Sequence, residues 1–188
     1  MSVTQLDRRH LFGAPVRKKI LDEVRAYLQT AGPIGKLVSI SIGGSAEVNV
    51  YIRNQARLAA ELGIKFDQQC WDSNISQDTC KARIQDMNDS SGVLGVILQR
   101  PLPEHINVRS LQSAIHPLKD VEGMNPASIG NIVYSDIALV PCTAAASIEM
   151  IKATKLNLEG LEVVMIGHSE IVGRPVAMML MAEGATVT

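Results

Sequence analysis

The chain has 188 residues, enough for one large domain or two small ones. Its 46% hydrophobic and 20% charged residues are ordinary for a soluble globular protein, and only 3% aromatic residues predict an aliphatic core. The formal net charge of −1 gives no overall bias towards nucleic acid or an anionic membrane. We therefore expect neither a nucleic-acid partner nor a membrane partner.

The cysteines and the N-terminus bear on metal binding and on compartment. Cys70, Cys80 and Cys142 have no C-x-x-C or zinc-ligand spacing, so no metal site is predicted. An odd number of cysteines, with an N-terminus that lacks the apolar core of a secretory signal, fits a reducing cytoplasm. No apolar stretch approaches the length of a membrane span. The sequence predicts a soluble cytoplasmic protein.

Helix-like and strand-like segments alternate along the first part of the chain. Apolar residues recur at helical spacing in some segments, and short aliphatic runs end at Gly or Pro in others. The predicted order is helix 15–28, strand 37–42, helix 48–62, a short strand starting at 64–66, helix 79–87, strand 92–98 and helix 108–115. Strands that alternate with helices predict an α/β domain with a parallel, doubly wound sheet.

A change of organisation is predicted near residue 140, where a loop-rich stretch gives way to a helix over 144–154. The predicted domains are residues 1–140, an N-terminal α/β domain, and residues 141–188, a bridging helix with the first part of a Rossmann-type domain. Residues 162–188 supply one strand, one helix and the start of another strand, fewer than a Rossmann-type sheet needs. We expect the chain to be part of a longer protein.

The turn over 167–173 has the features of a phosphate-binding turn. It follows an apolar run over 163–166, which predicts a buried strand, and precedes a helix-like pattern over 176–182. Its two glycines, Gly167 and Gly173, would let the backbone approach an anion at a helix N-terminus, where N–H groups and the helix dipole favour negative charge. The spacing departs from Gly-x-Gly-x-x-Gly. Taken by itself, the pattern therefore fits an ordinary strand-to-helix turn as well as it fits a phosphate-binding turn.

Four sequence blocks occur in a specific order along nearly the whole chain. They are Ile42-Gly43 to Tyr51 with Leu62-Gly63-Ile64; Gly95 to Pro103; His116 to Gly123 with Pro141-Cys142-Thr143; and Gly167 to Pro175 with Gly184 to Thr188. The motifs Pro-Leu-Pro, Pro-x-Lys-Asp-Val-x-Gly and Pro-Cys-Thr are jointly very specific. Together the blocks closely resemble the bifunctional methylenetetrahydrofolate dehydrogenase/methenyltetrahydrofolate cyclohydrolase family.

The resemblance implies a two-domain α/β enzyme that binds folate in a cleft between its domains. The implied reaction is hydride transfer from methylenetetrahydrofolate to a nicotinamide nucleotide, followed by hydrolysis of methenyltetrahydrofolate to the formyl derivative. We expect NADP as the cofactor, with NAD as the alternative, a tetrahydrofolate derivative as the substrate, and a homodimer. The other determinants of NAD or NADP preference should lie beyond Thr188.

The resemblance also assigns catalytic positions. Tyr51 matches the family tyrosine that stacks on the folate, although plain packing is the ordinary role of such a residue. Gln99 matches a glutamine that pairs with a family lysine responsible for proton handling in cyclohydrolysis. That lysine is Gln55 here, one helical turn after Tyr51. Because glutamine has no titratable proton, Gln55 can polarise a substrate but cannot be a general acid or base.

Several substrate-binding positions also depart from the family. Glu122 replaces an aspartate that binds the amino-pyrimidine edge of the pterin, and its extra methylene moves the carboxylate by about 1.5 Å. Arg100 replaces an apolar residue, and a surface role is as well supported as a role in the cleft. Val48 replaces a serine, and Asn125 stands near a position often held by histidine. The expected substrate-binding residues are Tyr51, Gln99, Arg100 and Glu122.

On the nucleotide side, Ser169 and Gly173 match the family's phosphate-binding turn. His168 stands where some relatives carry an arginine that can reach the extra phosphate of NADP, but a solvated turn residue is the simpler interpretation. The expected cofactor-binding residues are Gly167, His168, Ser169, Ile171, Val172 and Gly173.

Three functions fit these residues. The first is a working dehydrogenase with weak or absent cyclohydrolase activity. The second is a catalytically silent homologue that binds folate or nucleotide, and the third is an enzyme on the same scaffold that acts on another pterin or a small carbon donor. For the first we expect Tyr51, Gln55, Gln99 and Glu122 to line one cleft that faces the nucleotide turn.

Overall fold

The computed structural model describes residues 10–32, 34–44 and 46–188. Residues 1–9, which lack the apolar core of a secretory signal, lie outside the described residues. The chain divides into two compact units, with one division between Pro141 and Cys142. This division is close to the predicted boundary. Helix α1 (Gly13–Ala31), however, groups almost entirely with the C-terminal unit and not with the α/β unit.

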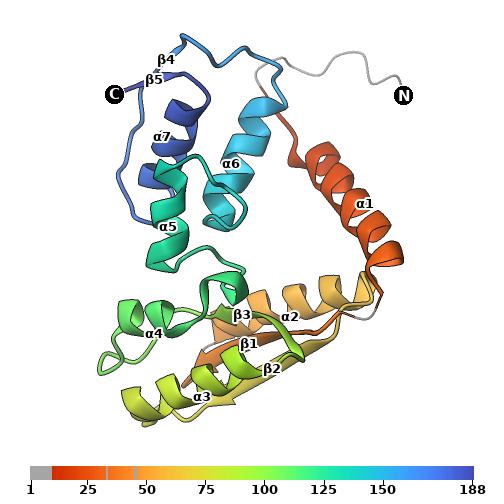
Figure 1. Cartoon of the computed structure of the whole chain (residues 1–188), viewed down its shortest axis with the longest axis vertical. Coiled ribbons are helices and arrows are strands. Elements are labelled where there is room, and N and C mark those ends of the chain that lie inside the picture. Colours follow the sequence, from red (N-terminus) through yellow and green to blue (C-terminus); the bar gives the residue numbers. More distant parts are fainter. Residues whose placement is uncertain (1–9, 33, 45) are drawn as a thin grey trace. The chain divides into compact units, whose positions relative to one another are not determined.

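The α/β unit is built on a three-stranded parallel sheet in the order β2–β1–β3 (Figure 1). The strands are β1 (Lys36–Ile42), β2 (Phe66–Trp71) and β3 (Val93–Leu98). Helix α2 (Ala46–Glu61) connects β1 to β2, and helix α3 (Gln77–Asp89) connects β2 to β3. These strand–helix–strand connections confirm the predicted α/β fold with a parallel sheet.

The two faces of the sheet differ in chemistry because successive strand residues point to opposite sides. One face carries the main apolar core, in which residues such as Val38, Ile40 and Val96 join Ile84 of α3 and Leu111 of α4 (Val108–Ala114). On the intervening positions β1 carries two buried serines, Ser39 and Ser41. Buried serines in a strand need hydrogen-bond partners, and one of them finds its partner in the candidate site described below.

The segment after α4 is held by a lysine that points into backbone carbonyls. The segment contains the 3₁₀ helix η1 (Pro117–Lys119), and Lys119 Nζ donates to the carbonyl oxygens of Met87 at 2.8 Å, Asn88 at 2.7 Å and Ser90 at 2.7 Å. These carbonyls belong to the C-terminal end of α3, where a cation also interacts favourably with the helix dipole. The lysine of the Pro-x-Lys-Asp-Val-x-Gly motif is therefore structural.

We predict that Lys119→Met destabilises the protein by about 2 kcal/mol, because three half-buried carbonyls lose a charged donor while the apolar stem is retained. Denaturant unfolding measures the change. Lys81→Met is the matched control, since Lys81 lies on α3 and its side chain is exposed. Equal stability of the two variants would contradict the role assigned to Lys119.

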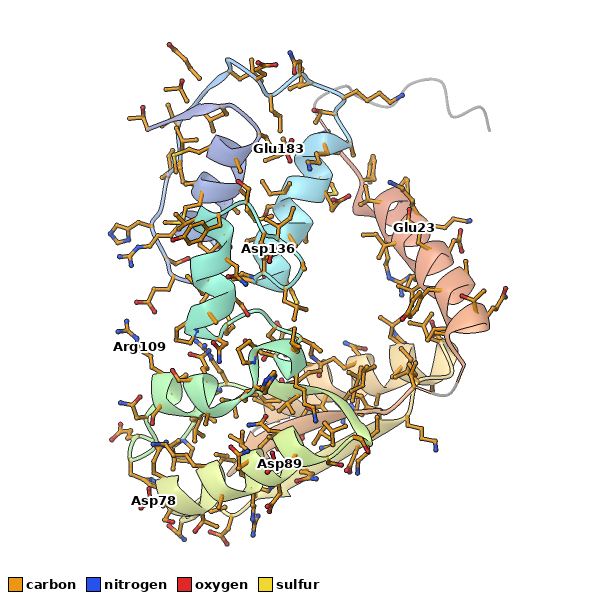
Figure 2. The ribbon with its side chains drawn as sticks, viewed as in Figure 1. Glu23, Asp78, Asp89, Arg109, Asp136 and Glu183 are labelled. Atoms are coloured by element: carbon orange, nitrogen blue, oxygen red, sulfur yellow. The ribbon has the colours of Figure 1, made fainter. Side chains whose placement is uncertain are left out.

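The smaller unit contains helices α6 (Cys142–Lys152) and α7 (Gly173–Ala182) and a parallel pair of short strands, β4 (Glu162–Val163) and β5 (Thr186–Val187). Buried Ile148 of α6 and Leu180 of α7 contribute to its interior. Lys152 Nζ lies 2.6 Å from Glu183 Oε1, and Figure 2 shows Glu183 directly after α7.

The strand predicted over 163–166 is shorter in the structure, and its last residues are exposed in the part of the protein that the structure describes. Strand β4 ends at Val163, and the side chains of Val164 and Ile166 are 74% and 96% exposed. Within the described chain β4 is paired with β5, and two short strands leave one edge and much of a face to solvent.

Two further differences concern helix α5 and strand β2. Helix α5 (Pro126–Val133) lies in the stretch where no element was predicted, although Asn125 as N-cap and Pro126 in the first turn are a recognisable start signal. Strand β2 extends to Trp71 through polar residues, which are common on an edge strand. None of the described helices has the length and apolar character needed to span a membrane.

Candidate active site

A pocket lies at the carboxyl ends of β1 and β3. In open α/β sheets this edge is where ligands bind, because loops that follow neighbouring parallel strands meet there. The pocket has a volume of about 270 Å³ and opens to solvent. Its lining includes the turn after β1 and the Pro-Leu-Pro motif after β3: Ser41, Ile42, Gly43, Gly44, Val48, Ser73, Pro101, Leu102 and Pro103.

Beside this edge the structure brings together Gln55 and Gln99, two of the predicted site residues. Gln99 follows β3 and is buried, and its Nε2 donates to Gln55 Oε1 of α2 at 2.7 Å. The same nitrogen donates to Ser39 Oγ of β1 at 3.0 Å. Ser39 was not predicted, and the signal for it was a serine within the apolar run of β1.

Tyr51 lies one helical turn before Gln55 on α2, and its side chain is 69% exposed. A packing role, the ordinary alternative for a helical tyrosine, would require burial. The exposed ring is available for stacking on a flat ligand. Val48, at the position of a family serine, is instead buried and lines the pocket.

Glu122 lies along the open edge of β3. The bridge between Val96 and Asp120 continues the sheet pairing towards it, and its Oε2 accepts a hydrogen bond from the Leu98 N–H at 3.1 Å. Burial raises the pKa of Glu122 to about 7, and the nearby Asp120 adds to the shift, whereas the Leu98 N–H and Arg100 oppose it. A carboxyl group with this pKa changes its charge near neutral pH.

Arg100 is exposed at the end of β3. Its charge nevertheless acts on Glu122, since it lowers the pKa of that carboxyl group. Arg100 therefore acts electrostatically on Glu122 from an exposed position.

Asp120 and Asn125 form a buried structural pair behind Glu122. Asp120 accepts hydrogen bonds from the backbone N–H groups of Glu122, at 3.2 Å, and of Asn125, while burial raises its pKa. Asn125 Oδ1 accepts from Ala127 N at 2.8 Å, and its Nδ2 donates to the carbonyl oxygen of Ile115 at 2.8 Å. Asn125 therefore begins α5 and holds the loop, and its side chain is engaged in these bonds.

The turn over 167–173 closes on itself through Ser169. Its Oγ accepts from the N–H groups of Val172 at 3.1 Å and Gly173 at 3.3 Å, and its carbonyl oxygen accepts from Arg174 N at 3.0 Å. Ser169 thus satisfies N–H groups at the start of α7, which begins at Gly173 and not at residue 176 as predicted.

Both glycines of this turn are required by its backbone. Gly167 has φ +118°, and a Cβ on Gly173 would lie 2.3 Å from the Gly167 carbonyl oxygen. Among the other predicted cofactor residues, His168 and Ile171 are exposed and Val172 is half-buried. These residues surround one tight turn at a helix N-terminus. That Tyr51, Gln55, Gln99 and Glu122 line one cleft, and that this cleft faces the turn, stays a prediction.

Among the residues that the structure describes, no three His, Cys, Asp or Glu side chains gather as a metal site would require. The predicted site residues offer the amides of Gln55 and Gln99, the carboxyl of Glu122, the guanidinium of Arg100 and the Tyr51 hydroxyl. Such a set can bind and orient an organic ligand.

Two family models match the chain. The tetrahydrofolate dehydrogenase/cyclohydrolase catalytic domain matches residues 11–122, and the NAD(P)-binding domain of tetrahydrofolate dehydrogenase/cyclohydrolase matches residues 141–188. The curated Bifunctional protein FolD 2 of Ruegeria pomeroyi is 69% identical over 185 residues, which are 98% of this chain and 63% of that protein. The chain thus spans about 63% of the length of this relative.

Solved structures agree in fold. The bifunctional FolD methylenetetrahydrofolate dehydrogenase/cyclohydrolase from Campylobacter jejuni superimposes with a TM-score of 0.88 at 33% identity, covering 94% of this chain and 64% of that one. The Trypanosoma brucei enzyme of the same name, in complex with NADP and an inhibitor, has a TM-score of 0.83 at 29% identity, covering 94% and 62%.

Proposed function

Because the chain belongs to the tetrahydrofolate dehydrogenase/cyclohydrolase family, we propose that the protein oxidises methylenetetrahydrofolate to methenyltetrahydrofolate with a nicotinamide nucleotide. The observation that supports this most is the hydrogen bond between Gln55 and Gln99 at the end of β3. An exposed Tyr51, the hydrogen-bonded pair Gln55 and Gln99, and the carboxyl of Glu122 come from α2, from the end of β3 and from the segment beside it.

Each side chain supports a step of this function. The Tyr51 ring can stack on the pterin, and an ionised Glu122 can accept hydrogen bonds from adjacent N–H donors of the amino-pyrimidine edge. Gln55 and Gln99 offer polar, uncharged contacts beside the ring. Hydride transfer depends chiefly on positioning, so it needs no proton carrier from this set.

NADP is the cofactor that we propose, with NAD as the alternative, and the complex of the Trypanosoma brucei relative with NADP supports it. The turn residues fit a nucleotide, since Gly167 and Gly173 allow a tight backbone turn directly before the N-terminus of α7, where the helix dipole favours an anion. The nicotinamide would accept the hydride. We also propose a homodimer, as the family resemblance implies.

We further propose that cyclohydrolase activity is weak. Hydrolysis of methenyltetrahydrofolate needs a group that moves protons, and the hydrogen-bonded amides of Gln55 and Gln99 do not titrate. A water held by this pair, or a residue beyond Thr188, is the alternative proton carrier.

Two assays on the full-length protein test the proposal. The first follows reduction of NADP or NAD in the presence of methylenetetrahydrofolate, and the second follows the loss of methenyltetrahydrofolate without nucleotide. Nicotinamide reduction with slow hydrolysis is the expected result. Binding of folate without turnover would instead indicate a silent homologue, and turnover of another pterin only would indicate a different enzyme on this scaffold.

We predict that Gly173→Ala weakens NADP binding at least about tenfold, because its Cβ would collide with the Gly167 carbonyl oxygen and open the turn. Isothermal titration measures the affinity. Gly130→Ala is the control, since no atom lies within 4 Å of a Cβ built on Gly130. Unchanged NADP affinity in Gly173→Ala would show that the nucleotide does not use this turn.

A further inference from the structure

We infer that Ser39 is a positioning residue of the folate site, acting through Gln99 on the amide of Gln55. The inference rests on the proposed function and assigns a role to a residue that neither the sequence motifs nor the family resemblance singled out. Ser39 is fully buried in the central strand β1, with no exposed surface. Gln99 is the middle member of a hydrogen-bond chain, with Ser39 at one end and Gln55 at the other.

The two hydrogen bonds of Gln99 use up its donors. A glutamine side-chain nitrogen carries two hydrogens, and here one is directed to Ser39 Oγ at 3.0 Å and the other to Gln55 Oε1 at 2.7 Å. The Gln99 amide is thereby fixed with its nitrogen between the two partners. Its Oε1 is left as the acceptor.

This arrangement also fixes the amide of Gln55. Because Gln55 Oε1 accepts from Gln99, the remaining hydrogen-bonding group of Gln55 is its Nε2, which has two N–H donors. Gln55 is half-buried on α2, one turn from the exposed Tyr51. Because Gln99 is buried, the group of the pair that is left for the substrate is the half-buried, uncharged amide of Gln55, which Gln99 holds in place.

Ser39 contributes the part of this arrangement that the pair cannot supply alone. Without the contact to Ser39, the Gln99 amide is held by Gln55 alone, and both side chains can move on their flexible stems. A serine hydroxyl can accept from the amide nitrogen or donate to the amide oxygen, so Ser39 fixes the place of the Gln99 amide group. The buried Ser39 hydroxyl adds a second contact at a fixed point of the rigid sheet.

The test is a double-mutant cycle on the full-length protein, with kcat and KM of the dehydrogenase reaction as readouts. Ser39→Ala is expected to lower kcat about 3- to 10-fold, the range for one neutral hydrogen bond, and to change KM for folate less than about 2-fold. In a Gln99→Ala background the same substitution should have no further effect, because Ser39 acts only through Gln99. Ser128→Ala, which removes another buried serine hydroxyl from the α/β unit, is the matched control and should leave kcat unchanged.

Side-chain amide NMR gives a second readout that needs no activity. Ser39→Ala should shift the side-chain amide resonances of both Gln99 and Gln55, whereas Ser128→Ala should shift neither. The inference is overturned if the Gln55 amide does not respond to Ser39→Ala, or if the loss in kcat persists undiminished in the Gln99→Ala background. An inactive wild-type protein whose Gln55 amide does respond would overturn the proposed function and leave the Ser39 coupling supported.

Discussion

Replacing Gln55 by lysine is expected to raise the rate of methenyltetrahydrofolate hydrolysis by about 10²–10⁴-fold, the usual contribution of a general acid–base group. The native amide pair has no group that titrates near neutral pH. An ammonium group one turn after Tyr51 would supply one, and partial burial beside Gln99 would lower its pKa towards neutrality. The dehydrogenase rate should change much less, because hydride transfer uses no proton carrier from this pair.

The hydrogen-bond chain can accommodate this substitution. Gln99 would turn its amide so that its oxygen accepts from the new ammonium group, and the Ser39 hydroxyl, now 3.0 Å from the Gln99 nitrogen, can donate as well as accept. Gln55→Met is the matched control, since it has a similar length and no proton. Its hydrolysis rate should not rise above the native level.

If Gln55→Lys alone does not raise the rate of hydrolysis, two explanations remain, and one further variant distinguishes them. If Glu122 misplaces the pterin relative to a family aspartate, only the combination of Gln55→Lys with Glu122→Asp gains activity. If the wild-type protein already hydrolyses methenyltetrahydrofolate at a rate comparable to its dehydrogenase turnover, another group moves the proton and the account of Gln55 is wrong. Rates of both reactions, measured on the same preparations, distinguish these outcomes.

The strands and helices that the sequence predicted best are those with a strong apolar pattern. Strands β1 and β3 are continuous aliphatic runs, and both form at the predicted positions. Helix α5 and the polar half of β2 lack such a pattern. The start of α5 is indicated by Asn125 as N-cap and by Pro126, and the polar residues of β2 are typical of a strand at the edge of a sheet.

The candidate site was predictable to the extent that its residues lie in motifs. The pairing of Gln55 with Gln99 followed from the family resemblance and is present as a 2.7 Å hydrogen bond. Ser39 was not predictable, since its partner is 60 residues away in the sequence and no local pattern links them. Lys119 lies in a motif, but its structural role depends on carbonyls at the end of α3, which only the folded chain brings near.

The second large effect concerns Glu122, whose folded-state pKa of about 7 lies above its ordinary value of 4.5. An acid with a raised pKa binds more protons in the folded state between these two pH values, so the free energy of unfolding should fall as pH rises through that window. A difference of about 2.5 pH units corresponds to at most about 3 kcal/mol, fully lost above pH 7. Glu122→Gln should therefore stabilise the protein at pH 8 by up to about 3 kcal/mol and by little at pH 4.5, as denaturant unfolding at the two pH values would show.

The control for this effect is Glu104→Gln, which removes an exposed carboxylate from the same unit and should change stability by little at either pH. The glutamine introduced at position 122 can still accept from the Leu98 N–H through its oxygen, so the hydrogen bond itself is not the quantity tested. A stability difference between Glu122→Gln and wild type that does not grow from pH 4.5 to pH 8 would contradict the raised pKa.

The same carboxyl group should make folate binding depend on pH, in the direction opposite to stability. Donors on the amino-pyrimidine edge need an ionised acceptor, and a group with a pKa of about 7 is about one tenth ionised at pH 6 and nine tenths ionised at pH 8. KM for folate should therefore fall about tenfold between these pH values in the wild-type protein and stay high and flat in Glu122→Gln. Stabilisation of Glu122→Gln with undiminished folate affinity would show that Glu122 is a buried acid of the fold and not a ligand of the pterin. Stabilisation together with lost affinity would mean that the protein tolerates a less stable fold because substrate binding needs that charge.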